Sequence, residues 1–260
     1  MPLPDRDFDV TEVAVPWRVL TRRGDTVTFA TERGDVVPEA DPRLLTGVVF
    51  GKLGAAPDAI ECYRAMEASA EFRAPIAWSA IDVARFDGLM LPGGHAPGMK
   101  QYLEGEELRR KVLDFWRTNK PVAAICHGVI VLARTIDDAT GKSVLAERRT
   151  TCLPKYMERL AYTLTFWKLG RYYRTYPEYV EDEVRRALDD PRRQFACGPT
   201  TLGARGTDDD DAHAFVVEDG RYVSARWPGD AWAFARAFAR AMDAHATRET
   251  TQTIDAAERS

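Results

Sequence analysis

The sequence predicts an α/β fold in which a mostly parallel sheet has helices on both faces. Residues 86–94, FDGLMLPGG, form an apolar run that ends in Pro-Gly-Gly, which is typical of a buried strand opening into a tight loop. Residues 105–120 carry apolar side chains at helical spacing. Residues 121–125 then predict the next strand, and residues 128–136 predict the next helix. Strands that alternate with helices indicate βαβ units.

The N-terminal region predicts one helix and one strand before a mixed segment. Residues 11–31 predict a helix that ends at Gly24, followed by a strand at about residues 26–30, because glycine often follows a helix and β-branched residues alternate after it. Residues 35–80 predict a loop with one or two short helices.

A helical insertion follows the predicted βαβ units. Residues 143–154, SVLAERRTTCLP, are compatible with a strand. Residues 156–190 are rich in aromatic side chains and predict helices broken at Pro177. We expect this segment to cover one end of the sheet as a cap. Packing is the simplest interpretation of its Trp and Tyr residues, since aromatic residues at helical spacing usually belong to a core.

The C-terminal part predicts a hairpin and a last helix. Residues 214–230 contain an Asp-Gly turn between two apolar stretches, which favours a β-hairpin. Residues 231–245 predict an amphipathic helix, and the polar residues 246–260 predict a flexible tail. Residues 1–245 are therefore expected to form a single α/β domain.

Composition excludes several classes of function. The 260 residues are 45% hydrophobic and carry a net charge of −4, with no basic stripe for nucleic acid. No apolar stretch approaches the ~20 residues that span a bilayer, and the first residues, MPLPDRDFD, do not resemble a signal peptide. The four cysteines are widely spaced without metal-binding motifs, so we expect a reduced, cytoplasmic protein without disulfides or structural zinc.

Cys126 and His127 interrupt an apolar run at the junction of a predicted strand and helix. A strand that turns sharply into a helix presents its turn residue at the carboxyl edge of the sheet, as in a nucleophile elbow. The helix N-terminus favours a thiolate, and Gly128 leaves room for the turn. The residue types therefore fit Cys126 as a nucleophile and His127 as its base. A buried, inert Cys126 is the alternative that local sequence leaves open.

A second loop supports the reactive interpretation. Gly93, Gly94 and His95 follow the neighbouring strand, and the two glycines free backbone N–H groups to bind an oxyanion. His95 either takes part in this substrate-binding loop or only caps it.

These motifs together resemble the ThiJ/PfpI superfamily, the cysteine-elbow relatives of class I glutamine amidotransferases. The resemblance rests on TEVAVPWRVLTRRG, FDGLMLPGGHAPG and KPVAAICHG, covers residues 10–160 and resumes at 214–243. It implies a flavodoxin-like sandwich with a nucleophile elbow, here with a helical cap insertion. The elbow with its upstream Gly-Gly loop is specific for the superfamily but not for one activity.

The resemblance also implies roles for four residues. Glu12 matches the acidic residue that relatives hold, protonated, against the cysteine, while Cys126 matches the nucleophile and His127 the adjacent histidine. The heat-shock chaperone and glyoxalase III-like branch completes its triad with an acid after a Leu-Pro or Phe-Pro turn, and Glu158 in CLPKYMERL fits that position.

Two features depart from the family pattern. Only MPLP precedes DRDFDVTEV, which is too short for the usual first strand, so we expect either a true start further upstream or a sheet that lacks this strand. The insertion at 156–190 is larger than in the smallest members, which implies a capped, narrower pocket in which large peptides would be poor substrates.

The leading functional hypothesis is a cofactor-independent, glyoxalase III-like conversion of methylglyoxal to a hydroxy acid, or related deglycase chemistry. A cysteine peptidase or amidase is the nearest alternative, and a holdase chaperone or redox sensor is the non-enzymatic one. True glutamine amidotransferases take a histidine and a glutamate from a late His-x-Glu motif. The corresponding residues of this chain read ARWPGDAW, so this activity is less favoured. We expect a homodimer that acts on a small carbonyl or amide substrate, without metal, nucleic-acid or membrane partners.

Overall fold

The central sheet is formed by four short strands that bring distant parts of the chain together. In the computed structural model, residues 1–49, 53–201 and 203–258 are described. The elements in chain order are β1 (Arg6–Phe8), α1 (Val10–Arg22), β2 (Ala30–Thr31), β3 (Glu39–Ala40), α2 (Pro42–Thr46), α3 (Pro57–Glu67), α4 (Ala70–Arg73), β4 (Ile76–Ala77), η1 (Trp78–Ala80), η2 (Val83–Arg85), β5 (Leu89–Leu91), α5 (Met99–Glu104), α6 (Glu106–Arg117), β6 (Val122–Ile125), α7 (Gly128–Ala133), β7 (Ile136–Asp137), β8 (Lys142–Ser143), α8 (Lys155–Leu169), α9 (Val180–Arg186), α10 (Pro191–Gln194), β9 (Val216–Asp219), β10 (Tyr222–Ala225), η3 (Pro228–Asp230) and α11 (Ala231–Glu258).

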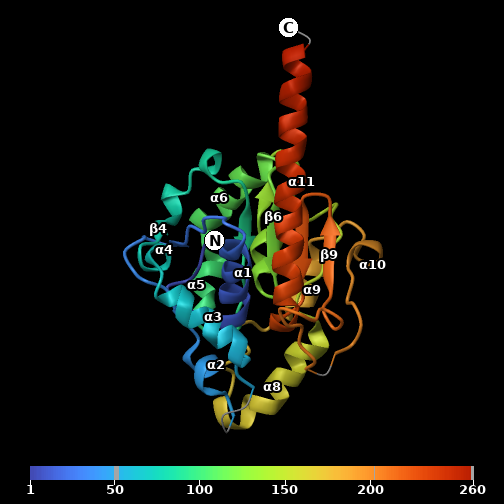
Figure 1. The fold of residues 1–260 in the computed structure, drawn as a ribbon. Helices are drawn as coiled ribbons and strands as arrows, with labels where there is room; N and C mark the ends of the chain where they lie inside the picture. Colours follow the sequence, from blue (N-terminus) through green and yellow to red (C-terminus); the bar gives the residue numbers. More distant parts are fainter. Residues whose placement is uncertain (50–52, 202, 259–260) are drawn as a thin grey trace.

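The sheet order is β5-β6-β10-β9, with β6 parallel to both of its neighbours and β9 antiparallel to β10. All residues of β5, β6 and β10 are buried, which explains their continuous apolar sequences. Helix α7 packs against β5 and β6, while α11 packs against β6 and β10 and contacts α1. The predicted α/β architecture, with helices on both faces of a mostly parallel sheet, is therefore confirmed (Figure 1).

The first helix follows its sequence signals closely. Asp9 caps α1 by accepting hydrogen bonds from the N–H groups of Thr11 and Glu12, and the helix ends before Gly24, whose φ of 94° favours glycine. The segment 35–80 contains three short α-helices, one more than the upper end of the prediction.

The first residues form more extended structure than their length suggested. The Ala30 N–H donates to the Met1 carbonyl and the Leu3 N–H donates to the Ala30 carbonyl, so the chain start lies alongside β2. Strand β1 then pairs in parallel with β3. The first residues therefore pair with β2 and β3, whereas the four-stranded sheet, as far as the described residues show it, contains no strand from them, in line with the expected absence of the usual first strand from that sheet.

The cap insertion is helical, as predicted, with α8 and α9 separated by the turns around Pro177. Residues 143–154 do not form one strand: Ser143 ends β8, residues 144–147 form turns, and Thr150 forms an isolated bridge with Phe195. Helix α11 continues to Glu258 and projects from the body (Figure 1), where a flexible tail was predicted from residue 246. No glycine or proline interrupts residues 231–258, so nothing in the sequence ends the helix. Among the described residues, no helix is long and apolar enough to cross a membrane.

Candidate active site

The backbone turns sharply at Cys126, where β6 ends and α7 begins. Cys126 has a φ of 57°, which lies in the left-handed region that residues other than glycine rarely adopt. Gly128 lies so close to the end of β5 that a Cβ there would be 2.1 Å from the Leu91 carbonyl oxygen and 2.6 Å from that of Pro92. The local sequence thus forms a strained elbow that fits only because residue 128 has no side chain.

Cys126 and His127 form a buried pair. The Cys126 Sγ lies 3.4 Å from the His127 Nδ1, and the two residues are 2% and 3% exposed. Burial, with the neighbouring His95 and the Arg134 guanidinium, holds the pKa of His127 well below its usual range. His127 is therefore neutral at pH 7 and can accept the thiol proton.

Glu12 reaches the same site from the first turn of α1. One carboxyl oxygen accepts a hydrogen bond of 2.9 Å from the Gly93 N–H. Burial and the nearby Asp9 carboxyl raise the pKa of Glu12 well above its usual range, while an interaction with the Cys126 thiol opposes that shift. The protonated form of Glu12 is therefore favoured, and in this form it can donate a hydrogen bond to a developing thiolate.

The Cys126 thiol is itself held in its neutral form at rest. Burial raises the pKa of this thiol well above its usual range, and the negative charge of Asp9 and the hydrogen bond with Glu12 act in the same direction. A hydrogen bond from the His127 amide to the sulfur acts against them. The resting site is therefore a thiol beside a neutral imidazole, and the proton moves only as the sulfur attacks.

The Gly-Gly loop lies beside the elbow, but its two glycines differ in role. The Gly93 N–H is occupied by Glu12, so this residue positions the acid rather than donating to an oxyanion as predicted. Gly94 has a φ of 150°, and among the described residues its amide and that of His127 form no backbone hydrogen bond. The Gly94 amide is therefore a candidate oxyanion donor, and the His127 amide, which contacts the Cys126 sulfur at rest, is a second one.

His95 connects the site to the cap. Its ring stacks on the His127 ring with centroids 5.8 Å apart, and the centroid of the Tyr173 ring lies 4.2 Å from that of His95. The Tyr173 hydroxyl donates to Asp41 at 3.0 Å, and the Thr175 hydroxyl donates to the His95 carbonyl at 2.5 Å. The sequence analysis missed Tyr173 and Asp41. Only the Tyr-Tyr pair within the insertion could have indicated them, and it was interpreted as packing.

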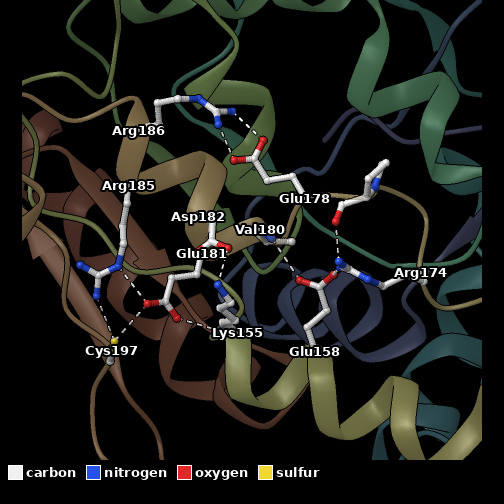
Figure 2. A network of polar contacts seen from close by, with 11 residues as sticks. Lys155, Glu158, Arg174, Glu178, Val180, Glu181, Asp182, Arg185, Arg186 and Cys197 are labelled. Carbon is white, nitrogen blue, oxygen red and sulfur yellow. Dashed lines mark hydrogen bonds and ion pairs between the residues drawn. The ribbon is translucent and has the colours of Figure 1, made fainter.

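Glu158 does not complete the predicted triad. Its two oxygens accept hydrogen bonds from Arg174 at 2.6 Å and from the Val180 N–H at 3.1 Å, as Figure 2 shows. No hydrogen bond joins it to His127 in the described part of the chain. The reason is electrostatic, because a guanidinium and the positive N-terminal end of α9 both attract this carboxylate. Glu158 therefore anchors the cap beside the site.

Removing the Glu158 side chain is expected to weaken the fold more than the chemistry. Glu158→Ala leaves Arg174, whose side chain is 9% exposed, without its partner, which should lower the free energy of unfolding by about 3–5 kcal/mol. Glu158→Gln keeps an acceptor for Val180 and should cost less. Urea denaturation and kcat on the same samples test this. A loss of kcat in Glu158→Gln beyond ~100-fold at unchanged stability would instead indicate the triad role.

The sequence and the fold were compared with those of known proteins. The sequence profile of the family described as ThiJ/PfpI family-like matches residues 3–199. An uncharacterised protein of Schizosaccharomyces pombe is 31% identical over 235 residues, 88% of this chain and 77% of that protein. A deglycase of Thermococcus kodakarensis is 29% identical over 167 residues, 64% of this chain and 69% of that protein. The crystal structure of glyoxalase III from Candida albicans superposes with a TM-score of 0.65 at 18% identity, covering 92% of this chain and 94% of that one.

Proposed function

The chain belongs to the ThiJ/PfpI-like family, and from that premise we propose that it is a cofactor-independent enzyme that converts a small reactive aldehyde, such as methylglyoxal, to a hydroxy acid. The observation that carries the proposal is the buried Cys126–His127 pair on a strained elbow with protonated Glu12 beside it. The names of the deglycase and glyoxalase III relatives support reactive-carbonyl chemistry.

The proposed reaction begins with attack of the Cys126 sulfur on the aldehyde carbon. The thiol proton passes to the His127 Nδ1, and the carbonyl oxygen becomes the hydroxyl of a hemithioacetal. Amides of Gly94 and His127 stabilise the negative charge that develops on this oxygen. As negative charge develops on the sulfur, the protonated form of Glu12 donates a hydrogen bond to it.

The remaining steps move protons without a cofactor. His127 removes the hydrogen from the former aldehyde carbon as a proton and returns it to the neighbouring carbonyl carbon, while the hemithioacetal O–H proton moves to the oxygen of that neighbouring carbon, which gives a thioester of the hydroxy acid. Water then attacks the thioester, releases the acid and restores the thiol. One molecule of methylglyoxal and one of water give one hydroxy acid, so no oxidant is needed.

The cap favours a small substrate over a peptide. Tyr173 and Thr175 contact His95 directly above the elbow, and Cys126 is 2% exposed. A peptide chain has no room there unless the cap moves away. A small aldehyde needs far less space.

A substrate panel tests the proposal. Purified protein is incubated with methylglyoxal, glyoxal, small amides and p-nitrophenyl esters, and products are identified by NMR. We expect lactate from methylglyoxal and slower or no turnover of amides and esters. Faster turnover of an amide or ester than of any aldehyde would support the amidase alternative instead.

A holdase function is the second candidate, because helix α8 exposes four large apolar side chains. These are Leu160, Leu164, Phe166 and Trp167, between 45% and 58% exposed. Suppression of citrate synthase aggregation measures this function, and an unchanged effect in Cys126→Ser would separate it from the chemistry.

The protonation state of Cys126 gives a further prediction. Because burial raises the pKa of its thiol and lowers that of His127, the resting pair is neutral from about pH 6 to pH 8. The difference in absorbance at 240 nm between wild type and Cys126→Ser, which reports thiolate, is expected to be close to zero at pH 7 and to rise only above pH 8. A full thiolate signal at pH 7 would show an ion pair and reverse this assignment.

A further inference from the structure

A cavity lies at the opposite end of the sheet from Cys126. Its volume is about 470 Å³, and its lining includes Asn119, Arg148, Arg221, His245 and Arg248. Arg221 immediately precedes β10 and Asn119 lies just before β6, whereas Cys126 follows the far end of β6. The length of the sheet therefore separates this cavity from the candidate active site.

The cavity has an excess of positive charge in a protein whose net charge is −4. Arg221 directs its guanidinium to the main-chain carbonyls of Trp116 at 2.7 Å and Lys120 at 2.9 Å rather than to a carboxylate. Arg148 lies 3.9 Å from Asp219, which also accepts the Arg149 N–H. Among the described side chains, Arg221 and Arg248 form no ion pair, and no carboxylate lines the cavity.

The guanidinium groups of Arg148 and Arg221 are held in place by protein contacts alone. The Trp116 ring lies 4.3 Å from the Arg221 guanidinium carbon and 5.9 Å from that of Arg148. Burial and the charge of Arg148 lower the pKa of Arg221 to about 10. Two guanidiniums that face the same ring at partly buried positions repel each other, and a bound anion would offset this repulsion.

We propose that this cavity binds a small phosphate monoester through Arg148, Arg221 and Arg248. Guanidinium groups match phosphate oxygens with paired hydrogen bonds, and three of them suit a dianion better than a single carboxylate. The volume of about 470 Å³ exceeds what a phosphate ion fills, so an organic group is expected to occupy the rest.

Calorimetric titration of the full chain with glucose 6-phosphate tests the site. Inorganic phosphate, glucose and sodium chloride at matched ionic strength are titrated in parallel. We expect a dissociation constant below ~1 mM for glucose 6-phosphate, weaker binding of phosphate, and none of glucose. Higher salt should weaken binding, because the cavity is partly open to solvent.

Two variants assign the residues. Arg148→Gln and Arg248→Gln are each expected to raise the dissociation constant at least ~10-fold, and Arg192→Gln, an exposed arginine on α10, should leave it unchanged. Arg221 is left in place because it holds two main-chain carbonyls. Circular dichroism checks that the variants fold. Lack of binding by glucose 6-phosphate, equal binding of phosphate, or equal affinity of all three variants and wild type would overturn the proposal.

Discussion

Replacing Cys126 with serine is expected to lower the rate of methylglyoxal consumption at least ~1,000-fold while the fold remains intact. A serine hydroxyl is a far weaker acid than a thiol. His127, whose pKa burial holds well below its usual range, cannot remove its proton. The substitution exchanges one small buried atom for another, so the strained backbone at residue 126 should persist.

The matched control is Cys62→Ser, which changes a buried free thiol on α3 instead of the one at the elbow. It should retain wild-type turnover. Lactate formation followed by NMR gives the rate, and thermal denaturation followed by circular dichroism confirms folding. If Cys126→Ser keeps more than ~10% of the activity, the sulfur is not the nucleophile and the proposed mechanism fails.

The elbow could be predicted from sequence because its determinants are local. The order Cys-His-Gly after a buried strand specifies both the turn and the absence of a side chain where β5 approaches. Glu12 was also predictable, but only through the family resemblance. Its contact with Gly93 joins residues that are 81 positions apart.

The surroundings of His127 could not be predicted, because their determinants are not local in the sequence. The partner of Glu158 depends on the turns between α8 and α9, which bring Arg174 back to it, and no local pattern specifies that path. The contact of Tyr173 with Asp41 likewise joins two segments 132 positions apart. Such contacts depend on how the whole cap insertion folds, and the spacing of residues in the sequence does not specify them.

Changing Gly128 to alanine is expected to be the most damaging of the single-methyl additions at the site. The new Cβ would lie 2.1 Å from the Leu91 carbonyl oxygen, well inside van der Waals contact, and both groups belong to backbone that cannot rotate away. Either β5 or the elbow must move. We expect the free energy of unfolding to fall by about 3 kcal/mol.

The same displacement should reduce catalysis in the molecules that still fold. A shift of about 1 Å between Cys126 and the amides that face it can cost ~100-fold in kcat. Gly141→Ala is the control, since that glycine has a φ of 67° but no atom within 4 Å of an added Cβ. Its cost should be only the ~1–2 kcal/mol of a left-handed backbone, with normal kcat. Urea denaturation and kcat at 15 °C compare the two variants. Equal stability of the two variants would show that the close approach of β5 does not explain why glycine occupies position 128.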